Sequence, residues 1–213
     1  MLLLNGLSIN WHIKTVSMIG ILAILSIGST AATNPPRLCD RGTCEIAGIK
    51  LGISTDRDVE RIFGRSPAAN TPDREGDRRC YVGADPNQTA IEFESWFGTI
   101  IRFRILKNRK LILSSCAKSA LMANHIATNS GLKLGLEKEE VLAILGAPTK
   151  VEGSRLFYER SFERSLTSEE RKRMDEVGGP PWKVKSINVI EHIKIFFVDT
   201  HVDSIDVTYN ETD

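Results

Sequence analysis

The chain repeats one pattern of glycine and apolar residues, and this repeat constrains the fold more than any other feature. The first copy begins with Gly48-Ile49-Lys50-Leu51-Gly52 and the second with Gly131-Leu132-Lys133-Leu134-Gly135. Each copy continues with a valine, two further apolar residues, a glycine and a proline: Val59, Ile62, Phe63, Gly64 and Pro67, then Val141, Ile144, Leu145, Gly146 and Pro148. A repeat of this length indicates two copies of one supersecondary unit.

The apolar spacing in each copy predicts a short amphipathic helix, because the valine and the two apolar residues stand at positions i, i+3 and i+4. Thr55 and Asp58 form a capping-box pattern before the first helix. Gly64 and Gly146 stand where a C-terminal cap is expected, and a proline follows each of them. A further helix is predicted over residues 117–129.

Alternating apolar and polar residues after each helix predict antiparallel strands joined by tight turns. The expected strands cover 79–82, 91–93 and 101–105 in the first copy, and 155–158, 193–197 and 205–209 in the second. We therefore expect an α+β fold: a tandem repeat of two units, each a short helix or helix pair packed on a roughly three-stranded antiparallel sheet.

These expectations divide the chain into a leader, a disulfide-containing segment and the two units. The expected ranges are 1–32 for the signal peptide, 33–47 for the disulfide-containing segment, 48–116 for unit 1 and 117–213 for unit 2. Unit 2 carries a helical insertion over 163–183, in which Thr167 and Glu170 form a second capping-box pattern.

The first 32 residues have the pattern of a secretory signal peptide. Lys14 is the only charged residue before Arg37, and an apolar run over 16–27 precedes a group of small residues. We expect cleavage near Ala31 or Ala32, and a periplasmic or secreted protein without stable membrane insertion. The alternative is an uncleaved N-terminal anchor, although a spanning helix needs about 20 apolar residues.

Four cysteines follow the leader, and an even number in an exported chain favours two disulfides. Cys39 and Cys44 can close a tight loop through Gly42, which leaves Cys80 to pair with Cys116. Four cysteines allow three pairings, so spacing alone does not decide between them. No Cys-x-x-Cys motif or neighbouring histidine indicates a metal site.

The repeat resembles the SmpA/OmlA family of small outer-membrane assembly proteins, and it is similar to the tandem fold of the secreted β-lactamase inhibitor protein. The resemblance covers 48–106 and 131–209, and it rests on Gly-x-x-Leu-Gly-x, a short helix with valine, leucine or phenylalanine before glycine, and then proline and a strand. It implies a bacterial envelope protein and says little about function. The chain lacks the lipidated cysteine of the assembly proteins, and its two copies bring it closer to the inhibitor-like arrangement.

The charge balance argues against nucleic acid or an anionic membrane as partner. The chain has 28 Lys and Arg against 27 Asp and Glu, and removal of Lys14 with the leader leaves 27 against 27. A neutral protein offers no electrostatic attraction to either partner. The sequence does not indicate an oligomeric state.

No pattern of catalytic or cofactor-binding residues is present in the sequence. His125, His192 and His201 lie outside any Ser-His-Asp or His-x-x-x-His pattern, and the glycines of the repeat lack the Lys-Ser or Lys-Thr ending of a phosphate loop. We therefore expect no catalytic residues, no metal and no cofactor, and we expect that the protein is not an enzyme.

These features favour a non-catalytic protein-binding module of the bacterial cell envelope or periplasm, with a protein partner. The alternative is a secreted inhibitor of a hydrolase such as a β-lactamase or a protease; a concave face bearing tryptophan and tyrosine would favour it. The candidate partner-binding residues are Pro181 and Trp182 in the insertion, where a tryptophan can anchor an interface. Arg102 and Arg104, on a basic strand face, are the other candidates, although such a face is also typical of a solvated strand.

Overall fold

The computed structural model describes residues 37–66, 69–70, 76–83, 89–107, 116–123, 126–176 and 186–212. The chain divides into two compact units, 1–34 and 35–213, and every described residue belongs to the second. The predicted signal peptide and the candidate residues Pro181 and Trp182 lie outside the described residues. Among the described residues, no helix combines the length and the apolar character needed to cross a membrane.

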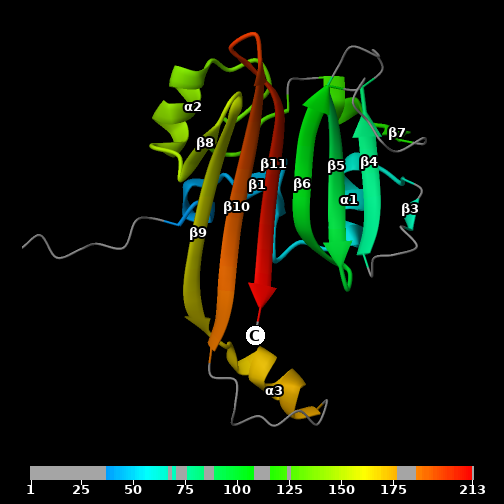
Figure 1. The fold of residues 1–213 in the computed structure, drawn as a ribbon. Coiled ribbons are helices and arrows are strands. Elements are labelled where there is room, and N and C mark those ends of the chain that lie inside the picture. Colours follow the sequence, from blue (N-terminus) through cyan, green and yellow to red (C-terminus); the bar gives the residue numbers. More distant parts are fainter. Residues whose placement is uncertain are drawn as a thin grey trace, which may run out of the picture. The chain divides into compact units, whose positions relative to one another are not determined.

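The described chain is dominated by one mixed sheet of nine strands (Figure 1). Its order is β3-β4-β5-β6-β11-β10-β9-β8 with antiparallel neighbours, and β7 pairs in parallel with β4. The strands are β3 (Ala69–Asn70), β4 (Gly76–Val82), β5 (Thr89–Trp96), β6 (Thr99–Lys107), β7 (Ala117–Lys118), β8 (Lys150–Glu152), β9 (Arg155–Ser165), β10 (Ser186–Val198) and β11 (His201–Thr212).

Helices are few and short in this part of the chain, and a small hairpin stands apart from the large sheet. The α-helices are α1 (Asp56–Phe63), α2 (Lys138–Leu145) and α3 (Ser168–Glu176), the 3-10 helices are η1 (Cys39–Arg41) and η3 (Ala120–Ala123), and the hairpin is β1 (Glu45–Ile46) with β2 (Ile49–Lys50).

The predicted fold class, two α+β units with a small sheet each, is wrong. β6 and β11 pair with each other between Arg102↔Thr208 and Leu106↔Ser204, so the strands of both copies form one continuous sheet. The physical reason is that each three-stranded meander ends in a strand with an open edge. Pairing the two edges satisfies backbone N–H and C=O groups that would otherwise stay exposed.

The predicted helix over 117–129 is also wrong. Ala117 and Lys118 form β7, and only the 3-10 turn Ala120–Ala123 follows within the described residues. Met122 is buried while Leu121 is 41 % exposed, so the apolar residues of this segment do not share one buried face. Backbone pairing of Ala117 with Tyr81 on β4 holds the segment extended instead.

Local predictions about the helices and hairpins are confirmed. The Asp58 carboxylate accepts a hydrogen bond of 2.9 Å from the backbone N–H of Thr55, as the capping box requires. The two long hairpins, β5–β6 and β10–β11, turn at the residues the sequence indicates. The disulfides join Cys39 to Cys44 and Cys80 to Cys116, the pairing that the sequence favoured.

The two faces of the sheet differ in chemistry. One face packs against α1, α2 and the β1–β2 hairpin, and its buried side chains include Phe93, Phe103, Ile193 and Ile205. Figure 1 shows these helices and the hairpin on one side of the sheet. We call the opposite side the outer face; it carries Arg78, Glu92, Glu94, Arg102, Arg104, Phe157, His192, Lys194, Phe196 and Asp206.

Candidate binding site

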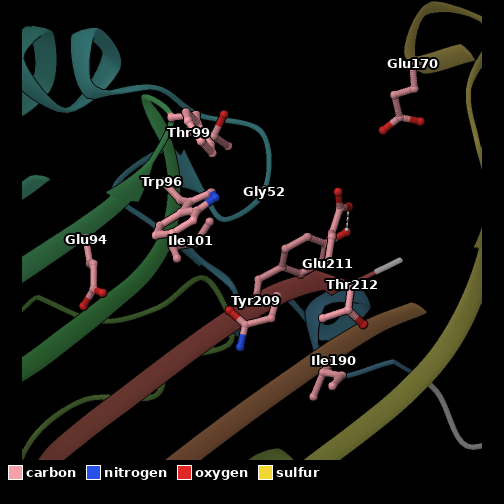
Figure 2. A pocket seen from close by; sticks show the side chains of 12 residues that line it. Gly52, Glu94, Trp96, Thr99, Ile101, Glu170, Ile190, Tyr209, Glu211 and Thr212 are labelled. Atoms are coloured by element: carbon pink, nitrogen blue, oxygen red, sulfur yellow. Dashed lines mark hydrogen bonds between the residues drawn. The ribbon is translucent and has the colours of Figure 1, made fainter. Parts of the chain in front are cut away.

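A cavity of about 770 Å³ opens where β6 and β11 separate. These strands pair only as far as Arg102 and Thr208, although β6 begins at Thr99 and β11 continues to Thr212. We call this cavity the β6–β11 notch; its volume lies in the range of ligand-binding pockets. Figure 2 shows its walls, with Glu94, Trp96, Thr99 and Ile101 on one side, Ile190, Tyr209, Glu211 and Thr212 on another, and Glu170 beyond them.

Two adjacent aromatic side chains lie at the rim of the notch, in the turn between β5 and β6. Trp96 is 42 % exposed and Phe97 is 81 % exposed, and their rings meet edge to face with centroids 5.3 Å apart. Phe97 and Gly98 are the two central residues of the turn and have φ angles of 48° and 78°. Such turns usually hold Asn-Gly or Asp-Gly, because a positive φ strains a bulky side chain. Phe97 therefore stands in an unfavourable backbone conformation and also faces solvent.

Asp56, the first residue of α1, holds the strained turn in place. The backbone N–H of Asp56 donates to the carbonyl oxygen of Gly98 at 3.1 Å. The Asp56 carboxylate accepts a hydrogen bond of 3.0 Å from the Ser95 hydroxyl, and it forms an ion pair with Arg79. Burial is the main cause that raises the pKa of Asp56, and Ser95 and Arg79 partly oppose it. These contacts of Asp56 fix the turn to the first residue of α1.

The floor of the notch is formed by a close contact between Tyr209 and Gly52. Gly52 has a φ of 73°, and a Cβ atom there would lie 2.5 Å from Cε1 of Tyr209. The Tyr209 hydroxyl donates to the Glu211 carboxylate at 2.9 Å. Burial, together with this carboxylate, raises the pKa of Tyr209 to about 12.

Arg164 on β9 ties the start of α3 to the end of β11. Its guanidinium lies 2.6 Å from the Glu170 carboxylate and 2.7 Å from that of Glu211. The hydrogen bond from Arg164 is the main cause that lowers the pKa of Glu170 to about 2. The Thr167 backbone N–H also donates to Glu170 at 2.7 Å, which confirms the second capping box. Arg164 is therefore shared by two carboxylates, and the three side chains together carry one net negative charge.

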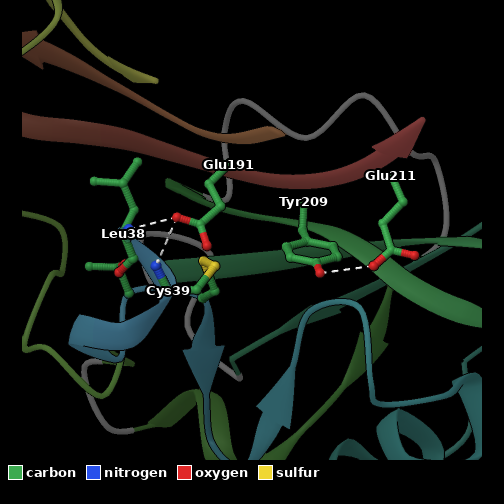
Figure 3. The surroundings of a disulfide bond; sticks show 7 residues. Leu38, Cys39, Glu191, Tyr209 and Glu211 are labelled. Atoms are coloured by element: carbon green, nitrogen blue, oxygen red, sulfur yellow. Dashed lines mark hydrogen bonds between the residues drawn. A yellow bond between two sulfur atoms is a disulfide. The ribbon is translucent and has the colours of Figure 1, made fainter. Parts of the chain in front are cut away.

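The N-terminal disulfide loop is fastened to the inner face of the sheet beside this floor (Figure 3). The buried Glu191 carboxylate accepts hydrogen bonds from the backbone N–H groups of Leu38 at 2.6 Å and Cys39 at 3.3 Å. Glu191 stands directly opposite Tyr209 in the β10–β11 pairing. Burial is the main cause that raises the pKa of Glu191, and the two N–H donors oppose it.

Arg102 and Arg104, predicted as partner-binding residues, lie on the outer face and are paired with carboxylates. Arg102 donates to Asp206 with Nε at 2.7 Å and contacts Glu94 at 3.4 Å, and Arg104 pairs with the buried Glu92. The hydrogen bond to Asp206 is the main cause that raises the pKa of Arg102, whereas desolvation lowers the pKa of Arg104. A binding role for these arginines stays a prediction, and their charges are compensated within the sheet.

The outer face of β9 and β10 combines cations with aromatic rings. Lys194 lies 5.5 Å from the ring centre of Phe157, and Arg155 lies 5.6 Å from that of Phe196. His192 stacks on Phe157 with ring centres 6.3 Å apart. Such contacts hold long cationic side chains flat against the sheet. This part of the outer face is more aromatic than the salt-bridged part on β4 to β6.

Besides His192, the described residues contain one histidine, His201. His201 sits in the β10–β11 turn, where its Nδ1 is 2.9 Å from the Asp199 carbonyl oxygen. Within the described ranges, no group of three or more His, Cys, Asp or Glu side chains is arranged to hold a metal ion. His192 lies within β10 and His201 at the start of β11, and His125 lies outside the described residues.

Trp96 and Phe97 are not among the site residues predicted from the sequence. A tryptophan is usually a core residue, and a phenylalanine in a turn does not by itself indicate a binding site. The signal was present in Phe97-Gly98 itself, because a two-residue hairpin turn with a phenylalanine at its first position contradicts ordinary turn chemistry.

Comparison with protein family models finds no match, and comparison with curated proteins finds none. Among solved structures, the chain is similar to a Streptococcus mutans protein that is provisionally described as a β-lactamase inhibitor protein. The two share 10 % sequence identity with a TM-score of 0.24, and the match covers 82 % of this chain and 94 % of the other. A similarity this loose says nothing about the role of the chain, and the resemblance to the SmpA/OmlA family stays a prediction.

Proposed function

We propose that the chain is a non-catalytic, exported protein-binding module that holds its partner through Trp96 and Phe97. The observation that carries the proposal is the exposure of these two adjacent aromatic side chains on a strained turn. Strained backbone persists where the surrounding structure holds it, and such sites are often functional. Exposed aromatic residues that cluster are typical anchors of protein interfaces.

Two further observations support this proposal. Ile53, which is 67 % exposed, stands between Gly52 and Ser54, whose backbone bonds to Ile100 near the same turn, so this part of the chain offers a further exposed apolar side chain. The two disulfides fit an oxidising compartment outside the cytoplasm, as the leader predicts.

The test is affinity capture from the native envelope fraction with the immobilised mature chain. Trp96→Ala is compared with Leu121→Ala, because Leu121 is 41 % exposed and Trp96 is 42 % exposed. The wild type and Leu121→Ala are expected to capture the same protein, and Trp96→Ala is expected to lose it. Equal capture by Trp96→Ala, or capture of no specific protein by the wild type, would refute the proposal.

The second candidate function is inhibition of a hydrolase. The observation that favours it is the gathering of Trp96, Phe97 and Tyr209 around one hollow, because a concave site bearing tryptophan and tyrosine suits an inhibitor. Purified β-lactamase and a secreted protease are assayed with wild type and Trp96→Ala. Inhibition by the wild type that is lost in Trp96→Ala would favour this candidate. If neither enzyme is inhibited, the binding module is not an inhibitor of these two enzymes.

A further inference from the structure

We propose that the β6–β11 notch binds an extended peptide segment of the partner, which adds a strand to the free edge of β11. The inference rests on the proposed function and specifies the form in which the partner binds. It follows from three features: an unpaired strand edge, a wedge that keeps the edge open, and the chemistry of the surrounding side chains.

The unpaired edge is the last part of β11, from Tyr209 to Thr212. One side of this stretch pairs with β10, from Glu191↔Tyr209 to Asn188↔Thr212. On the other side, the ladder with β6 ends at Thr208, and among the described residues no further strand or backbone hydrogen bond joins this edge. Unpaired N–H and C=O groups of an edge strand are a template for another strand.

A short segment of the chain keeps β6 from closing onto this edge. The N–H of Gly52 donates to the carbonyl oxygen of Ile100 at 2.8 Å, and the N–H of Ile100 donates to that of Ser54 at 2.8 Å. The backbone groups of Ile100 are therefore occupied, and the ring of Tyr209 packs against Gly52. The separation of β6 and β11 is thus built into the fold.

The side chains around the notch suit an uncharged, strand-forming segment. Trp96, Ile101 and Ile190 provide apolar contact (Figure 2). Glu94 is paired with Arg78, whereas Glu170 and Glu211 share Arg164 and keep one net negative charge, which disfavours an acidic segment; the apolar walls therefore provide the main attraction. Backbone hydrogen bonds would supply affinity, and alternate side chains of the segment would meet the apolar walls.

The probe is an unbiased library of seven-residue peptides displayed on phage and selected against the full mature chain. Synthetic copies of the enriched peptides are tested by hydrogen exchange and by fluorescence anisotropy. They are expected to protect those backbone amides of residues 209–212 that face the notch, which are alternate ones because the others bond to β10. Methylation of the peptide nitrogens that face β11 should weaken binding at least tenfold. Failure to enrich any peptide, protection elsewhere only, or tolerance of methylation would overturn the inference.

A pair of proline variants gives an internal control, because alternate residues of a strand direct their N–H groups to opposite edges. Of Asn210→Pro and Glu211→Pro, one removes a bond to β10 and the other a donor that faces the notch. Proline is tolerated where the N–H faces outward, so the variant with the wild-type melting temperature should be the one that loses the peptide. Glu211→Ala controls for the lost carboxylate. Full peptide binding by the tolerated proline variant would contradict the inference.

The two proposals fail separately. If Trp96→Ala loses the captured envelope protein and no peptide protects residues 209–212, the proposed function stands and the strand-binding inference falls. If peptides protect residues 209–212 but Trp96→Ala captures the partner normally, the notch binds strands and the aromatic turn is not the anchor.

Discussion

The hydroxyl of Tyr81 on β4 donates a hydrogen bond of 2.9 Å to the carbonyl oxygen of Gly64, the residue that ends α1. Tyr158 on β9 makes the corresponding bond to Gly146, at the end of α2, at 3.3 Å. Both tyrosines lie in the core, and burial raises the pKa of each to about 12. One tyrosine–glycine link thus fastens each of the two helices to the sheet.

Replacing either tyrosine by phenylalanine should lower the free energy of unfolding. Both hydrogen bonds are part-buried, and an intramolecular hydrogen bond of this kind contributes about 1 kcal/mol to stability. Tyr81→Phe should cost at least as much as Tyr158→Phe, because its bond is the shorter one. Urea denaturation measures both variants. Two variants as stable as the wild type would show that these bonds do not hold the helices.

Gly52→Ala should destabilise the protein more than Gly135→Ala. Both glycines have a positive φ, so alanine is strained at each by about 1–2 kcal/mol. Only at Gly52 would the new Cβ meet another group, the ring of Tyr209, and such overpacking costs about 1–3 kcal/mol more. Chemical denaturation compares the two. Equal losses would mean that the floor of the notch is not tightly packed.

Glu191→Gln should change how stability depends on pH. Burial raises the pKa of Glu191 above its usual 4.5. The stabilisation linked to this shift is therefore fully present below about pH 4.5, and it is lost as the pH rises through the raised pKa. Glutamine stays neutral and still offers an oxygen to Leu38 and Cys39. The stability of the wild type relative to Glu191→Gln should therefore fall as pH rises from 4 to 7. A difference that stays constant across this range would contradict the burial argument.

Arg164→Gln should raise the pKa of Glu170 from about 2 toward its usual 4.5, because the hydrogen bond from Arg164 is the main cause of the shift. In the wild type, the stabilisation of the fold that is linked to this lowered pKa is present above pH 4.5 and is lost as the pH falls toward 2. NMR titration of the Glu170 carboxyl carbon measures the change. Arg171→Gln is the matched control, since Arg171 donates to the Leu166 carbonyl oxygen. An unchanged titration in Arg164→Gln would refute the assignment.

Local features could be predicted from the sequence because they depend on neighbouring residues. The capping box of Thr55 and Asp58, the turn at Phe97-Gly98 and the alternation of β10 each follow from a few adjacent side chains. The disulfide between Cys80 and Cys116 could be favoured because the other two cysteines lie close enough to form a short loop of their own.

Long-range features could not be predicted in the same way. The pairing of Arg102 with Thr208 joins two strands far apart in sequence, and nothing in either strand identifies the other as its neighbour. The notch exists because the segment around Gly52 pairs with β6 next to the end of β11. β11 lies there only because it pairs with β6, so the notch could not be predicted without that pairing. Leu121 and Met122 suggested a helix through their spacing, but tertiary pairing of Ala117 with Tyr81 overrides that local preference.

The most direct test of the central claim is Phe97→Gly, measured for both thermal stability and partner affinity. Glycine adopts the positive φ of this turn without strain, so the variant should be more stable than the wild type by about 1 kcal/mol. If Phe97 anchors the partner, the same variant should bind the captured envelope protein with an affinity lower by about 2 kcal/mol, roughly thirtyfold. A gain in stability with weaker binding is the predicted result, and a gain in stability with unchanged affinity would contradict the account.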